Sequence, residues 1–78
     1  MNIPLKAYVL FIAKPGTSVD VVKELKKTKG VVSADAIYGR FDAIALIEVE
    51  GPEGLTNLIY NIIERVPNIV RTETCLIL

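Results

Sequence analysis

The sequence predicts a small α+β domain in which strands and helices follow the order β-α-β-β-α-β. The chain has 78 residues, and 51% of them are apolar. Four runs are rich in β-prone side chains, and two stretches between them repeat apolar residues at helical spacing. Because a chain of this length has room for one core, we expect residues 1–78 to form a single domain.

The first part of the chain is expected to form a strand and a helix. Residues 6–13 (KAYVLFIA) are almost continuously apolar and end before Pro15, which predicts a strand buried on both faces. Thr17 or Ser18 is a suitable N-cap for a helix that ends by Gly30. The apolar residues at helical spacing in this helix are Val19, Val22 and Leu25.

The second part predicts a hairpin, a helix and a last strand. Residues 31–38 (VVSADAIY) and 42–50 (DAIALIEVE) flank Gly39 and are expected to pair as a hairpin. A second helix ends before Pro67, and residues 69–78 (IVRTETCLIL) form the final strand. The apolar positions predicted on one face of this helix are Leu55, Leu58, Ile59, Ile62 and Val66.

This order of elements indicates a ferredoxin-like βαββαβ sandwich with an antiparallel sheet of order 4-1-3-2. The two most apolar strands would be central, and the strands with polar interruptions would form the edges. Both crossovers have the same hand, so both helices cover one face and leave the other bare. An apolar bare face of this size favours sheet-to-sheet homodimerisation.

Composition excludes several classes of function. The nine basic residues are balanced by nine acidic ones, which argues against direct nucleic-acid binding. The absence of histidine and the single cysteine exclude His-based proton transfer, Cys/His zinc sites and an intrachain disulfide, so no metal or cofactor is expected. The longest apolar run, residues 7–13, is far short of the roughly 20 residues of a membrane helix, and no signal peptide precedes it. We therefore expect a cytoplasmic protein that does not insert into the membrane.

One turn gathers residue types that suit a small zwitterionic ligand. It consists of Tyr38, Gly39, Arg40, Phe41 and Asp42. Glycine permits positive φ, which points neighbouring N–H groups together to hold a carboxylate, and Asp42 could bind an ammonium. These groups would grip a free α-amino acid. The alternative is a plain hairpin turn, for which glycine beside aspartate is common.

Other polar and reactive residues are expected to be structural. Cys75 lies beside apolar Leu76 and is expected to be a buried thiol. Glu48 and Glu50 lack a basic neighbour in sequence and are interpreted as solvated rather than as an acid/base pair. The lysines expected at the solvated end of the first helix are Lys23, Lys26, Lys27 and Lys29.

Three short motifs follow one another along nearly the whole chain: G-x-x-D after an aromatic residue, a helix-ending proline with an apolar pair, and T-x-T. Their residues are Tyr38, Gly39 and Asp42; Pro67, Ile69 and Val70; and Thr72 and Thr74. In order and spacing they resemble the RAM domain, the effector-binding domain of the Lrp/AsnC family of feast/famine regulators. The resemblance implies a ferredoxin-like sandwich that dimerises sheet to sheet, with dimers associating into rings, commonly octamers.

The resemblance also implies roles for individual residues. An amino acid effector would bind at contacts between dimers, its carboxylate near Gly39 and its ammonium on Asp42. Tyr38 or Phe41 would line the side-chain pocket. Arg40, at the tip of the turn, could pair with Glu73 or with a neighbouring subunit.

Thr72 and Thr74 of the last strand are the remaining candidates for this site. The resemblance implies that they lie near the ligand in an adjoining subunit. The alternative is that threonine occurs there only because it suits an edge strand.

Full-length members of the family carry an N-terminal helix-turn-helix domain, whereas this sequence begins at the first strand. It therefore resembles the stand-alone RAM proteins, which would sense amino acids without contacting DNA and could join a full-length Lrp/AsnC regulator. The alternatives are a structural assembly partner without ligand, an ACT-type amino acid sensor, and a small dimeric enzyme of the same fold. The absence of histidine weighs against the enzyme, so we expect no enzymatic activity.

Overall fold

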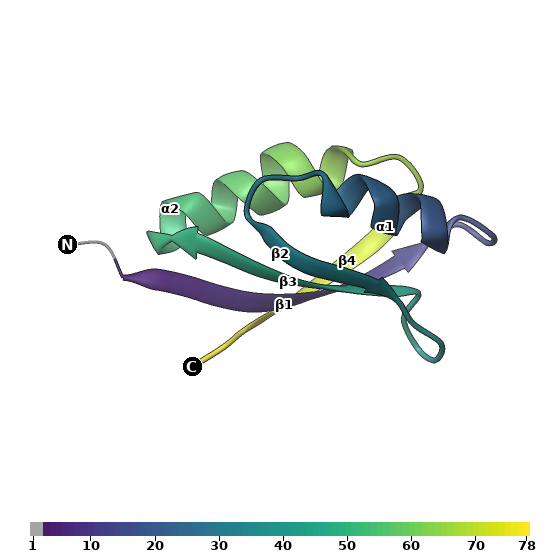
Figure 1. Ribbon diagram of the computed structural model, residues 1–78, viewed down its shortest axis with the longest axis horizontal. Coiled ribbons are helices and arrows are strands. Elements are labelled where there is room, and N and C mark those ends of the chain that lie inside the picture. Colours follow the sequence, from purple (N-terminus) through teal and green to yellow (C-terminus); the bar gives the residue numbers. More distant parts are fainter. Residues whose placement is uncertain (1–2) are drawn as a thin grey trace.

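A four-stranded antiparallel sheet carries helices on one face, as the computed structural model of residues 3–78 shows (Figure 1). The elements are β1 (Pro4–Ala13), α1 (Ser18–Lys26), β2 (Val31–Ala36), β3 (Ala43–Glu50), α2 (Gly51–Thr56), the π-helical segment η1 (Asn57–Ile62), the 3₁₀ turn η2 (Ile63–Arg65) and β4 (Ile69–Leu76). The strand order is β2-β3-β1-β4. This confirms the predicted ferredoxin-like fold and its sheet order.

The strand ends differ modestly from the predicted ones. β1 starts at Pro4, where it already pairs with Glu50 of β3. β2 ends at Ala36, two residues before the predicted end, because the chain there enters the turn to β3. β4 ends at Leu76, although the N–H of Ile77 still donates to the carbonyl of Lys6 at 2.8 Å.

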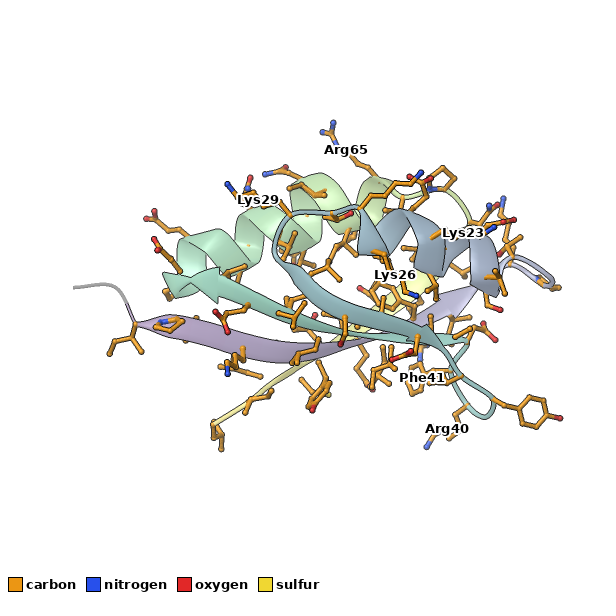
Figure 2. All side chains as sticks on the ribbon, viewed as in Figure 1. Lys23, Lys26, Lys29, Arg40, Phe41 and Arg65 are labelled. Atoms are coloured by element: carbon orange, nitrogen blue, oxygen red, sulfur yellow. The ribbon has the colours of Figure 1, made fainter. Side chains whose placement is uncertain are left out.

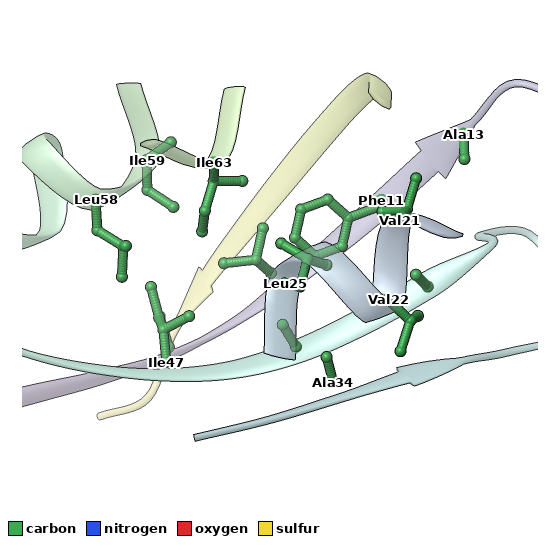
Figure 3. Close-up of a cluster of buried hydrophobic side chains, with 14 residues drawn as sticks. Phe11, Ala13, Val21, Val22, Leu25, Ala34, Ile47, Leu58, Ile59 and Ile63 are labelled. Carbon is green, nitrogen blue, oxygen red and sulfur yellow. The ribbon is translucent and has the colours of Figure 1, made fainter. Parts of the chain in front are cut away.

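The core lies between the sheet and the helices (Figure 3). β1 contributes alternate side chains to it, including the fully buried Val9 and Phe11, as the period of a strand requires. Tyr8, on the other face of β1, is 44% exposed. The prediction that β1 is buried on both faces is therefore wrong within one chain, because no helix covers its second face.

α1 packs on the sheet through a different residue than predicted. Val21, Val22 and Leu25 are buried, whereas Val19 is 58% exposed. Val21 is four residues before Leu25, so this pair lies on the sheet side of the helix and Val19 points away from it. Thr17 occupies the N-cap position as predicted, but its hydroxyl donates to the carbonyl of Lys14 at 2.6 Å rather than capping the helix.

The second helix changes its geometry along its length. It begins as an α-helix with a proline in the first turn, where a missing N–H costs nothing, and becomes a π-helix at Asn57. At the end of the π segment the N–H of Ile63 is shared between the carbonyls of Ile59 and Leu58, four and five residues earlier. Ile63 is therefore buried and Ile62 is 37% exposed, which corrects the prediction that Ile62 faces the core.

Each edge strand contains a β-bulge. In β2, Val31 pairs with Ile47 and Ser33 with Leu46, so Val32 is the extra residue. In β4, Arg71 pairs with Ile12 and Ile69 with Ala13, which leaves Val70 as the extra residue. Bulges at sheet edges interrupt the regular ladder and increase the local twist.

The second face of the sheet, here called the helix-free face, has an apolar centre. Its residues are Lys6, Tyr8, Leu10, Ile12, Ser33, Asp35, Ile44, Leu46, Glu48, Arg71, Glu73 and Cys75. Cys75 is exposed beside Tyr8, so the prediction of a buried thiol is wrong within one chain. Glu48, exposed as predicted, has a basic neighbour that sequence reasoning did not find: the ammonium of Lys6 lies 3.7 Å from its carboxylate. No helix in the part of the chain that the structure describes is long and apolar enough to cross a membrane.

Candidate ligand site

The five predicted turn residues lie together in the connection between β2 and β3. This connection hangs from the sheet on the side away from the helices (Figure 1), and Figure 2 shows Arg40 and Phe41 on that side. Two backbone hydrogen bonds hold its base: the N–H of Ile37 donates to the carbonyl of Asp42 at 3.0 Å, and the N–H of Asp42 donates to the carbonyl of Phe11 at 2.8 Å. The tip of the turn is thus a loop whose two ends are held by backbone hydrogen bonds.

Gly39 is required by the backbone conformation of the turn. Its φ is +150°, in a region that side-chain-bearing residues rarely adopt. A Cβ built at this position would meet no atom within 4 Å. Glycine is therefore needed for the bend, and it also leaves open space beside the backbone amides of the tip.

Asp42 has a structural contact that sequence reasoning missed. Its Oδ2 accepts a hydrogen bond from the N–H of Ala13 at 2.8 Å, so the partly buried carboxylate joins the turn to the end of β1. The partners are 29 positions apart in the chain, and only the sheet register brings them together. The described residues offer Oδ1 no hydrogen bond or ion pair, which leaves one carboxylate oxygen available to a cation.

The aromatic and cationic members of the turn differ in burial. Tyr38 is fully exposed and Phe41 is partly buried. Arg40 is exposed, and within residues 3–78 it forms no ion pair, so the possible pairing with Glu73 does not occur inside one chain. Tyr38 and Arg40 are therefore free to contact another molecule.

Thr72 and Thr74 lie apart from the turn within one chain. In the register they pair with Phe11 and Val9, so they point to the helix side of edge strand β4. Thr72 is in the same row of the sheet as Ala43, two strands and about 10 Å away. Since the turn hangs on the opposite side, a single chain does not bring these two groups around one ligand.

The surface hollows of the chain lie elsewhere. The widest of the four best-formed hollows of the described residues is bounded by the turn before β2, the end of β3 and the second helix. Its lining includes Lys29, Gly30, Glu48, Gly54 and Leu58. Residues 38–42 line none of the four, and residues 3–78 contain no group of three acidic or cysteine side chains that could hold a metal ion.

Comparison with known proteins gives a family and a fold. The family model of the Lrp/AsnC ligand binding domain matches residues 6–78. No curated protein sequence matches the chain significantly.

Among solved structures, FFRP-DM1 is 26% identical with a TM-score of 0.89, over 95% of this chain and 99% of that one. A hypothetical protein from Pyrococcus horikoshii is also 26% identical, with a TM-score of 0.89, over 95% and 89% of the two chains. The feast or famine regulatory protein of M. tuberculosis, complexed with L-methionine, is 25% identical with a TM-score of 0.80. This chain matches with 95% of its own length but spans only 50% of that protein.

Proposed function

Since the chain belongs to the Lrp/AsnC ligand-binding domain family, we propose that it is a single-domain regulatory module that binds a free amino acid at the 38–42 turn. The match of the family model over residues 6–78 carries this proposal. The M. tuberculosis relative complexed with L-methionine supports the class of ligand. The matched family is a ligand-binding one, and we propose no catalytic activity.

The turn supplies groups for both charged ends of an amino acid. The amides beside Gly39 hold the ligand carboxylate, because the positive φ and the missing side chain leave them open. The free oxygen of Asp42 holds the ammonium. Tyr38 and Phe41 line the side-chain pocket, and Arg40 flanks it.

The site is completed by a second chain. In one chain residues 38–42 line none of the four best-formed hollows of the described residues, and Thr72 and Thr74 lie on the other side of the sheet. Two copies associate through the helix-free face, and dimers associate further into an octamer-like ring in which these threonines approach a neighbouring turn. A full-length Lrp/AsnC regulator is a further partner through the same surfaces, and the module acts in the cytoplasm without contacting DNA.

The ligand is identified by thermal shift with the twenty amino acids, followed by titration calorimetry of the best stabiliser. We expect a dissociation constant from micromolar to millimolar, because about ten heavy atoms at roughly −0.5 to −0.8 kcal/mol each give about −5 to −8 kcal/mol. Asp42→Asn should abolish binding, whereas Asp20→Asn, an exposed acid on α1, should not change it.

Two results contradict the proposal. If Asp42→Asn binds as tightly as the native chain, the ammonium does not sit on Asp42. If none of the twenty amino acids stabilises or binds the chain, it is an assembly partner without a ligand.

A further inference from the structure

The widest of the four hollows lies away from the 38–42 turn and has the lining of a second binding site. We infer that this hollow, here called the helix-edge hollow, binds an aliphatic monocarboxylate. Lys29 and Asn57 hold the carboxylate. The aliphatic tail lies against Leu58 and Ile62. The site is independent of the amino acid proposed for the turn, because no residue of the turn lines it.

The helix-edge hollow has the size of a small-molecule site. Its volume is about 850 Å³, within the roughly 300–1,000 Å³ that ligand sites occupy. Its lining combines the apolar side chains of Val49, Leu58 and Ile62 with a few polar groups. Apolar walls with a small number of placed polar groups are the usual composition of such sites.

The π segment η1 supplies the apolar wall. In a regular α-helix Ile62 would follow Leu58 by about one turn and face the core. The wider π turn gives that place to Ile63, which is fully buried and points toward the sheet in Figure 3. Ile62 is left 37% exposed and lines the hollow. A large apolar side chain is thus spent on the hollow rather than on the core, and π-helical turns are frequent at functional sites.

Two glycines shape the floor of the hollow. A Cβ at Gly30 would lie 3.0 Å from Cδ2 of Leu58, and a Cβ at Gly54 would lie 3.3 Å from Cβ of Val49. Both glycines line the hollow. Their missing side chains let the second helix approach the loop before β2 and the end of β3 closely, so that Leu58 and Val49 form a continuous apolar floor.

Two hydrogen-bond donors stand at the rim. Lys29 is exposed, has no ion pair within residues 3–78, and lies on the loop beside the second helix (Figure 2). Asn57 uses its Oδ1 to accept a hydrogen bond from Nδ2 of Asn61 at 2.9 Å. Its own Nδ2, which donates, is then the part of the amide that a ligand can use. An ammonium and an amide N–H that both donate suit a carboxylate.

The two acids of the lining belong to the other side of the sheet. Glu48 pairs with Lys6 of β1, and Glu50 follows two residues later, so both side chains start on the helix-free face. There the carboxylate of Glu48 lies 3.7 Å from the ammonium of Lys6. Toward the hollow Glu48 presents its backbone, whose N–H donates to the carbonyl of Gly30 at 2.9 Å. Lys29 is therefore the charged group on the helix side of the hollow.

This lining distinguishes between classes of small ligand. An amine would place a second ammonium beside Lys29, and like charges repel. A polyanion would find one cation in the lining that residues 3–78 form. A single carboxylate on an aliphatic tail matches both the one ammonium and the apolar wall.

Octanoate is the probe for this site. We expect NMR titration to show binding in the millimolar range or below, with nuclear Overhauser contacts from its methylene chain to the methyl groups of Leu58 and Ile62. Octanamide, which has the same tail without the charge, should bind at least about fivefold more weakly. No binding at about 10 mM octanoate, or contacts to Leu10 and Leu46 of the helix-free face instead, overturns the inference.

Matched variants assign the contacts. Lys29→Met should weaken octanoate binding about fivefold or more, whereas Lys26→Met, at an exposed lysine outside this hollow, should not change it. Ile62→Glu should abolish binding by placing a carboxylate in the wall, whereas Tyr60→Glu, at a position 64% exposed on the same segment, should not.

The turn provides the last control. Asp42→Asn should leave octanoate binding unchanged, so a failure of the amino acid site and a failure of the helix-edge hollow are seen separately. Native affinity in both Lys29→Met and Ile62→Glu, or loss of octanoate binding in Asp42→Asn, overturns the inferred site.

Discussion

Asp42 serves the fold and the candidate ligand site with two different oxygens. Oδ2 accepts from the N–H of Ala13, and Oδ1 faces no partner among the described residues. A carboxylate held in this way is already oriented before a ligand arrives, which reduces the entropy lost on binding.

Removal of this carboxylate should therefore destabilise the empty protein as well. We expect Asp42→Ala to lower the free energy of unfolding by about 1–3 kcal/mol, because the partly buried N–H of Ala13 loses a charged acceptor. Urea denaturation without ligand measures this change. Glu64→Ala, at an exposed position of η2, is the control and should stay within about 0.5 kcal/mol. Equal stabilities of the two variants would show that the contact with Ala13 contributes nothing.

The residues of the turn could be predicted from their types, but the contact of Asp42 could not. Glycine beside aspartate and aromatics marks both a turn and a cradle for charged groups, and the structure places all five residues in one loop. The bond to Ala13 depends on the pairing of β1 with β3, which brings distant positions of the chain together. Whether the loop binds a ligand stays a prediction.

The second helix shows where periodicity stops being informative. A spacing of 3.6 residues per turn places Ile62 on the face of Leu58, and the wider π turn places Ile63 there instead. The strands were easier to predict, because the period of two is interrupted only at one bulged residue in β2 and one in β4. It holds in the rest of each strand. A one-residue change of helical register leaves no mark in the order of apolar residues when both positions are isoleucine.

Adjacent isoleucines therefore allow a matched test of the π segment. Ile63→Ala should cost about 2–5 kcal/mol of unfolding free energy, since the side chain is fully buried. Ile62→Ala should cost less than about 1 kcal/mol, because its side chain is partly in solvent. Thermal or urea unfolding of both variants measures these two losses of unfolding free energy. The reverse order of costs would mean that the helix is regular in solution.

The molecule as a whole presents two unlike faces. Helices cover one side of the sheet, while the other side combines an apolar centre, the overhanging turn and edge charges that have no ion-pair partner within residues 3–78 (Figures 1 and 2). In the proposed assembly the ligand groups come from more than one chain. A ligand of this kind has different affinities for the assembled and the separated chains, and that difference alone shifts the equilibrium.

We accordingly expect ligand and assembly to be coupled in both directions. Saturating amino acid should shift the midpoint of assembly by a factor of roughly 5–150 in concentration, and dilution should weaken ligand binding by the same factor. Light scattering over a dilution series, with and without the ligand, measures the shift. Identical mass distributions in both series would mean that binding does not act through assembly.

The bulges at Val32 and Val70 bear on how such a sheet avoids aggregation. A regular, open edge strand is a template for added strands, and unlimited addition gives cross-β fibrils. Here each edge carries an extra residue that breaks the ladder and, three residues further along the strand, a charge: Asp35 on β2 and Glu73 on β4. An incoming strand cannot keep its register past the bulge on either edge. The bulges thereby hinder growth by strand addition, and in the proposed assembly further copies use the face and the turn, where symmetric contacts close on themselves.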